Sequence, residues 1–219
     1  MSAIITYVST AGHSYKAING SGNTFWDLVN LPTAKGLLLF MTWGTATTNL
    51  NTPVFDTDGA PAESSLQRNG GSMNGQVFFW PNITDATQRF TITNSGAYTE
   101  GMIYPFSVDG HDTGDMFGSE WFVAGNSLSI AAAAGNAILA MGCPASQTFS
   151  GGGGSWATQV NTNSNSSGET SWNSTVLSGA QTINFNPSGT YLHVVEIKAA
   201  AGAAGGVPKT NRFLMHGVG

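Results

Sequence analysis

Hydrophobic and polar positions along the chain occur mainly as short alternating or apolar runs, a pattern typical of β-strands rather than helices. Gly, Asn, Pro and Ser clusters bound these runs, as expected of turns. Only residues 25–29 suggest one short helical turn, and residues 127–140 suggest a turn followed by a strand. The predicted strands cover residues 4–8, 36–43, 76–80, 88–93, 102–108, 120–124, 137–141, 182–185 and 191–198.

One strand pattern occurs twice without a gap. Residues 88–98 and 181–191 share the form Q-x-[FI]-x-[IF]-x-x-S-G-x-Y, at an offset of 93 residues. The alternating apolar positions place two side chains on one strand face, and Ser-Gly supplies a tight turn. We therefore expect related halves at about 34–107 and 127–198, either as two sheets of one sandwich or as two tandem sandwiches. Residues 109–126 contain no flexible linker, which favours a single domain over residues 1–198.

Composition narrows the class of protein. Charged residues make up 9% of the 219 positions, far below the ~25% of an ordinary domain. The 41% hydrophobic content excludes a disordered chain. The seven Lys and Arg residues are scattered, which argues against nucleic-acid binding, and no apolar run approaches the ~20 residues that span a bilayer. We predict an all-β, jelly-roll-like β-sandwich with two internally related halves and a C-terminal extension.

Four segments together show a resemblance to a known group of proteins. They are the aliphatic run with Trp at 34–43, the similar run at 134–142, the glycine-rich segment with Trp at 149–160, and the closing strand at 191–198. This succession resembles a loose group of β-sandwich virion proteins from tailed bacteriophages. The acidic residue usual after the first Gly of that group is absent, since Leu37 and Asn136 stand there. The resemblance implies a structural component of a virion rather than an enzyme.

Residues that could carry chemistry are few. The oxygen-rich segments 56–59 and 109–115 are similar to calcium loops only in composition, because neither has the spacing of an EF-hand. The four histidines lack zinc-ligand spacing, and no nucleophile elbow occurs. A polysaccharide-degrading enzyme needs only two distant carboxylates, and nothing in the sequence selects such a pair. We therefore expect no catalytic residues, metal or cofactor.

Two tryptophans are candidates for glycan contact. Trp156 follows four glycines at an expected loop tip, and Trp172 lies in an Asn/Ser-rich stretch. An aromatic ring beside neutral polar side chains can hold a sugar by stacking and hydrogen bonding. The alternative is that both rings pack into the sandwich, as large aromatic side chains usually do.

The C-terminal segment is the candidate for assembly. Residues 199–206 contain only Ala and Gly, and the following segment contains Arg212, Phe213, Leu214 and Met215. These four residues could add a strand to the sheet edge of a neighbour, or fold back onto their own sandwich. We predict a capsid decoration or minor head protein that is homo-oligomeric and bound to the major capsid protein or to fibre components. The alternative is a carbohydrate-binding, receptor-binding module of a head or tail fibre.

Overall fold

The computed structural model describes residues 2–8, 15–17, 22–44, 51–69, 73–94, 100–143, 148–151, 156–160, 169–173, 179–186 and 191–200. Within these ranges every regular element is a β-strand, so the predicted all-β sandwich is confirmed. The first half holds β1 (Ile4–Tyr7), β2 (Tyr15–Ala17), β3 (Gly22–Leu28), β4 (Gly36–Gly44), β5 (Val54–Phe55), β6 (Glu63–Ser64), β7 (Arg68–Asn69), β8 (Met73–Trp80), β9 (Gln88–Asn94) and β10 (Glu100–Asp109). The second half holds β11 (Phe117–Val123), β12 (Ser127–Ala132), β13 (Ala137–Cys143), β14 (Thr148–Gly151), β15 (Trp156–Val160), β16 (Glu169–Asn173), β17 (Gly179–Asn186) and β18 (Tyr191–Ile197).

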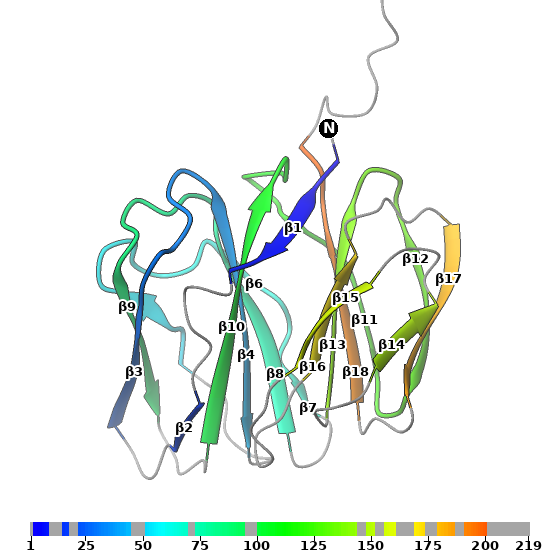
Figure 1. Cartoon of the computed structure of the whole chain (residues 1–219), viewed down its shortest axis with the longest axis horizontal. Helices are drawn as coiled ribbons and strands as arrows, with labels where there is room; N and C mark the ends of the chain where they lie inside the picture. Colours follow the sequence, from blue (N-terminus) through cyan, green and yellow to red (C-terminus); the bar gives the residue numbers. More distant parts are fainter. Residues whose placement is uncertain are drawn as a thin grey trace, which may run out of the picture.

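The strands form four antiparallel sheets, two in each half. In the first half, inner sheet 1 has the order β1-β10-β4-β8-β6, with β2 on β10 and β7 on β8, and outer sheet 1 has the order β3-β9-β5. In the second half, inner sheet 2 has the order β11-β18-β13-β16-β15, and outer sheet 2 has the order β12-β17-β14. Figure 1 shows the sheets as successive layers, with outer sheet 1 at the left, the two inner sheets in the middle and outer sheet 2 at the right.

The two halves have the same topology. Each half has eight successive strand positions when β6 and β7 are taken together as the fifth and β2 is set aside. Positions one, eight, three, six and five form the inner sheet, and positions two, seven and four form the outer sheet. This is the strand order of a jelly roll, except that the fifth strand pairs with the sixth in the inner sheet. The structural repeat therefore runs over 4–109 and 117–197, wider than the ranges expected from the sequence.

Strand register gives residue-by-residue equivalences between the halves. Phe90 pairs with Trp26 in the first half, and Ile183 pairs with Leu128 in the second. The repeated sequence pattern aligns β9 with β17 at an offset of 93 residues, and this alignment makes Trp26 and Leu128 equivalent. The neighbouring strands β8 and β16 hold the same place in the strand order of the two halves. The sequence repeat marks the best-preserved part of a duplicated jelly roll.

The central strands of the inner sheets, such as β4 and β13, are buried on both faces, and this accounts for their continuous apolar runs. Along β4, Leu37 and Leu39 face the core shared with outer sheet 1, whereas Leu38 and Phe40 face the core between the two inner sheets. A third core lies between inner sheet 2 and outer sheet 2 and contains Ile138. Each fully buried apolar side chain contributes roughly 1.5–3 kcal/mol. The middle core belongs to both halves, so the halves are joined by packing as well as by the chain.

The expected helical turn at 25–29 is wrong, because these residues lie in or next to β3. Trp26 and Leu28 are buried, whereas Phe25 and Asp27 are exposed on the opposite face. This period of two is that of a strand. Phe25, a bulky apolar residue on the exposed face of the strand, made the segment resemble a helical turn. The segment at 127–140 likewise begins with a strand, β12, which precedes the expected turn and β13.

Candidate functional site

The predicted glycan residues occupy two neighbouring strands. Trp156 is the first residue of β15 and pairs with Asn173, so the expectation that it lies at a loop tip is wrong. Trp172 lies within β16, where its backbone pairs with Ala157 on one side and with Leu139 on the other. The two tryptophans are therefore one position out of register on this strand pair of inner sheet 2, and such positions belong to opposite faces of a sheet. The predicted assembly residues Arg212, Phe213, Leu214 and Met215 lie outside the described residues.

The acidic loop at 56–59 is tied to the start of β9. The Asp58 carboxylate accepts hydrogen bonds from the Thr84 backbone N–H at 3.1 Å, from the Thr84 hydroxyl and from the Gln88 amide. The Asp56 carboxylate accepts one from the Arg89 backbone N–H at 3.0 Å. Carboxylates satisfied in this way hold a turn against a strand. These contacts give the loop a structural role.

The second oxygen-rich segment, at 109–115, connects the two halves. Asp112 accepts hydrogen bonds from the backbone N–H groups of Gly114 and Asp115, at 2.9 and 3.3 Å. Asp109 forms an ion pair with Lys35, and Asp115 forms one with Lys198 at 2.5 Å. Among the described residues, no three His, Cys, Asp or Glu side chains are placed to share a metal ion.

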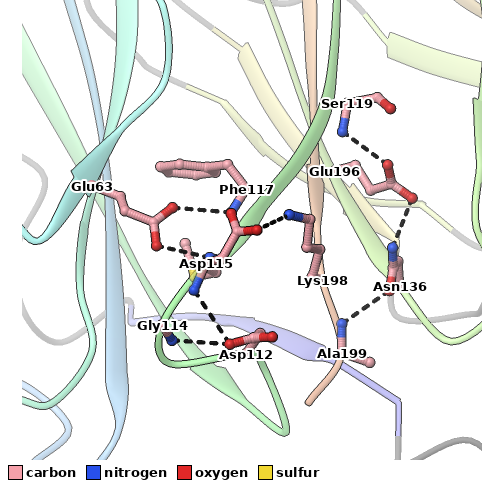
Figure 2. A network of polar contacts seen from close by, with 11 residues as sticks. Glu63, Asp112, Gly114, Asp115, Phe117, Ser119, Asn136, Glu196, Lys198 and Ala199 are labelled. Carbon is pink, nitrogen blue, oxygen red and sulfur yellow. Dashed lines mark hydrogen bonds and ion pairs between the residues drawn. The ribbon is translucent and has the colours of Figure 1, made fainter. Parts of the chain in front are cut away.

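Two glutamates fix the backbone beside this segment (Figure 2). Glu63 of β6 accepts hydrogen bonds from the backbone N–H groups of Met116 at 2.8 Å and Phe117 at 3.3 Å, so it joins the first half to the start of β11. Glu196 of β18 is 4% exposed and accepts hydrogen bonds from Ser119 N, Ala133 N and the Asn136 amide, at 2.7–2.9 Å. Although burial raises the pKa of Glu196, these hydrogen bonds outweigh it and hold the pKa below its usual value. Glu196 is therefore an ionised clamp that holds β11 and the β12–β13 turn.

A third glutamate lies between the halves. Glu120 of β11 accepts a hydrogen bond from the Leu66 N–H at 3.1 Å, and its Oε2 lies 3.7 Å from Arg68 Nη2 and 3.3 Å from His193 Nε2. Burial alone would raise the pKa of Glu120, but the hydrogen bonds from His193 and Leu66 hold it below its usual value. His193 is fully buried, and burial lowers its pKa despite the contact with Glu120. A neutral His193 ring that donates a hydrogen bond to ionised Glu120 agrees with both lowered pKa values.

These pKa directions predict that acid destabilises the protein. Burial lowers the pKa of His111 as well as that of His193, below the 6.5 of an unfolded chain. As the pH falls below about 6.5, the unfolded state binds protons that the native state does not, so the free energy of unfolding decreases. Below about 4.5 the depressed pKa values of Glu120 and Glu196 add a second loss of the same sign. Urea denaturation from pH 8 to pH 4 measures this dependence.

The variant His111→Gln supplies the control for the upper part of that pH range. It removes one titrating ring, so the loss of stability just below pH 6.5 should become smaller while the loss below pH 4.5 remains. Stability that stays constant between pH 7 and pH 5 in the unmodified protein would contradict the burial of neutral histidines.

His111 also explains a glycine at the start of β4. A Cβ atom on Gly36 would lie 2.6 Å from His111 Cε1 and 2.8 Å from Val108 Cγ1, closer than real contacts allow. Gly36→Ala should therefore lower the free energy of unfolding by about 1–3 kcal/mol, measured by urea denaturation. The control is Gly125→Ala, because the nearest atom to its added Cβ lies 3.7 Å away. Equal effects of the two variants would contradict this packing.

The outward surface of outer sheet 1 differs from the rest of the outer layers. We call Phe25, Asp27, Val54, Arg89 and Thr91 the Phe25 face. Phe25 and Val54 are 41% and 42% exposed, and both pair with Thr91 in the register, so they form a row across the three strands. The Arg89 guanidinium lies 4.4 Å from the centre of the Phe25 ring, and its Nε donates to Asp27 at 2.7 Å. Sequence reasoning missed this face because it assigned 25–29 to a helical turn; the period of two over 22–28 was the signal for it.

Comparisons with protein-family models, with curated proteins and with solved structures find no match to this chain. The resemblance to phage virion proteins therefore stays a prediction. Within the described ranges, no helix is long and apolar enough to cross a membrane.

Proposed function

We propose that this chain is a non-enzymatic structural protein of a bacteriophage virion, a capsid decoration or minor head component held in a symmetric assembly. The observation that carries the proposal is the duplicated jelly roll with a core shared between its halves. Jelly rolls recur in capsid and lectin domains, and a fold by itself does not assign a function. The contacts at the site add a second support, because Glu63, Glu120 and Glu196 all stabilise the backbone or the contact between the halves.

The low charge of the chain fits lateral packing in such an assembly. With 9% charged residues, few ions must be desolvated when a surface of this protein is covered by a neighbour. The residues Arg212 to Met215 remain the proposed docking strand toward the major capsid protein or a fibre component.

Binding to capsids tests this proposal. The purified protein should co-sediment with empty capsids of the phage that encodes it, at a fixed ratio to the major capsid protein. Deletion of residues 207–219 should abolish binding without changing the circular dichroism spectrum. Full binding by the truncated protein would remove the docking role of the tail. If the intact chain failed to bind either capsids or fibres, the structural role itself would be contradicted.

The second candidate is a carbohydrate-binding module of a fibre. It rests on Trp156, whose register partner on β16 is Asn173, so an aromatic residue is paired with a neutral polar one. An aromatic ring beside a neutral amide can stack on a sugar ring and form hydrogen bonds with it. This function predicts sugar-dependent quenching of tryptophan fluorescence that Trp156→Ala removes. A broad glycan panel without any binding would exclude it.

A further inference from the structure

The duplication allows one outer sheet to serve as a reference for the other. Strand register aligns the Phe25 face with the outward surface of outer sheet 2. Ser127 pairs with Asn184 as Phe25 pairs with Thr91, and Ser129 pairs with Thr182 as Asp27 pairs with Arg89. Ser150 pairs with Asn184 at the position that Val54 holds opposite Thr91. Phe, Asp, Val, Arg and Thr of the first half thus correspond to Ser, Ser, Ser, Thr and Asn of the second.

The second half shows what this fold needs at these positions. Small uncharged residues are sufficient there, although the strand order and the inward-facing core positions are the same. Folding therefore does not require the large apolar and charged residues of the Phe25 face, because the equivalent positions of the second half lack them. Phe25 and Val54 keep about two fifths of their surface exposed in the single chain. Two large apolar side chains exposed in one row of a sheet mark that face as a candidate contact surface.

Charge on the Phe25 face indicates what kind of partner covers it. Asp27 and Arg89 lie side by side in the row next to Phe25, Thr91 and Val54, joined by a 2.7 Å ion pair. A second copy turned by a two-fold axis across the face would bring Arg89 of one chain toward Asp27 of the other. The same rotation would place the two apolar rows against each other. A face that carries both charges beside an apolar row is complementary to itself, as a two-fold interface requires.

We propose that the Phe25 face is a two-fold interface between two copies of this chain. Each copy would contribute Phe25, Val54 and Thr91 to the apolar centre and the Asp27–Arg89 pair to the charged part. This inference deepens the proposed role in a symmetric assembly, and it rests on that role only for its biological meaning. Its test uses the purified full-length chain without capsids, so a failure here is distinguishable from a failure of capsid binding.

The experiment compares matched charge insertions at equivalent positions of the two outer sheets. Thr91→Glu places a carboxylate against the apolar row of the other copy in the proposed interface, and Asn184→Glu makes a matched charge insertion at the corresponding point of outer sheet 2. In sedimentation velocity, the unmodified protein and Asn184→Glu should have twice the 22.7 kDa mass of one chain. Thr91→Glu should weaken dimerisation at least about tenfold. Circular dichroism checks that both variants are folded.

A second variant guards against misfolding of Thr91→Glu. The double substitution Phe25→Ser and Val54→Ser introduces the residues that the second half already carries at these positions, and it should also yield monomers. The inference is overturned if the unmodified chain is monomeric up to about 100 µM. It is likewise overturned if Thr91→Glu leaves the dimer intact, or if Asn184→Glu dissociates it equally.

Discussion

Replacing Glu196 with alanine should lower the free energy of unfolding by about 1.5–3 kcal/mol, a large share of the total for a domain of this size. The carboxylate is buried and accepts three hydrogen bonds, from Ser119 N, Ala133 N and the Asn136 amide. Its removal leaves these donors without their charged acceptor. The added Cβ of a residue at 118 would lie 2.6 Å from Glu196 Oε2, so the carboxylate occupies a space that only glycine leaves open. Urea denaturation at pH 7 measures the loss.

The control is Asp115→Ala, which removes a carboxylate from the same region of the structure. Asp115 is 71% exposed and pairs with Lys198 at the surface, where an ion pair contributes about 1 kcal/mol or less. Glu196→Gln should fall between the two, because one amide oxygen cannot satisfy all three donors. If Glu196→Ala were no more destabilising than Asp115→Ala, the clamp role of Glu196 would be refuted.

Phe40→Ala should cost about 3–5 kcal/mol and destabilise both halves together. Phe40 is fully buried in the core between the inner sheets, where its ring lies 5.6 Å from that of Tyr104, and Leu139 and Val195 of the second half belong to the same core. The cavity would therefore open in a core that both halves share. Hydrogen exchange measured by mass spectrometry should show protection falling in peptides of β4 and β13 alike.

Leu66→Ala serves as the control, since Leu66 is 60% exposed and its truncation should change stability by less than about 0.5 kcal/mol. If Phe40→Ala lowered protection only in the first half, the halves would be separate cooperative units. The shared middle core would then make no energetic contribution to the second half.

The strands that could be predicted from the sequence are mostly those buried on two faces. Continuous apolar runs indicated β4 and β13, because the side chains on both faces of these strands enter a core. The two-residue strands β5, β6 and β7 are too short to carry a pattern. In the second half, β14, β15 and β16 lie among Gly, Ser and Asn residues whose local preference is for turns, and their pairing depends on distant partners.

The candidate site was less predictable than the fold. Clustered acidic residues such as Asp56 and Asp58 looked like metal ligands, and only their hydrogen-bond partners 26 or more positions away show their structural role. The Phe25 face depends on the strand assignment of 22–28 and on the distant Val54 and Arg89, which no local window contains. The repeat at an offset of 93 is visible in the sequence itself. Its extension to a whole jelly roll required the pairing of all the strands.

The internal duplication links the fold to the proposed role. Inner sheets 1 and 2 pack through the same strand position of each half, since Leu38 and Phe40 of β4 share the middle core with Leu139 and Met141 of β13. One chain thus has two outer sheets with the same strand order and different residues at their outward-facing positions. A building block of this kind suits an assembly in which one face contacts a second copy and another faces a different neighbour.

Quantitative mass spectrometry of purified phage particles tests the central claim most directly. If the chain is a virion structural protein, its peptides should be present in gradient-purified particles at a constant ratio to the major capsid protein, and that ratio should survive a high-salt wash. Absence of the chain from purified particles, together with its presence in the soluble fraction of infected cells, would contradict the account.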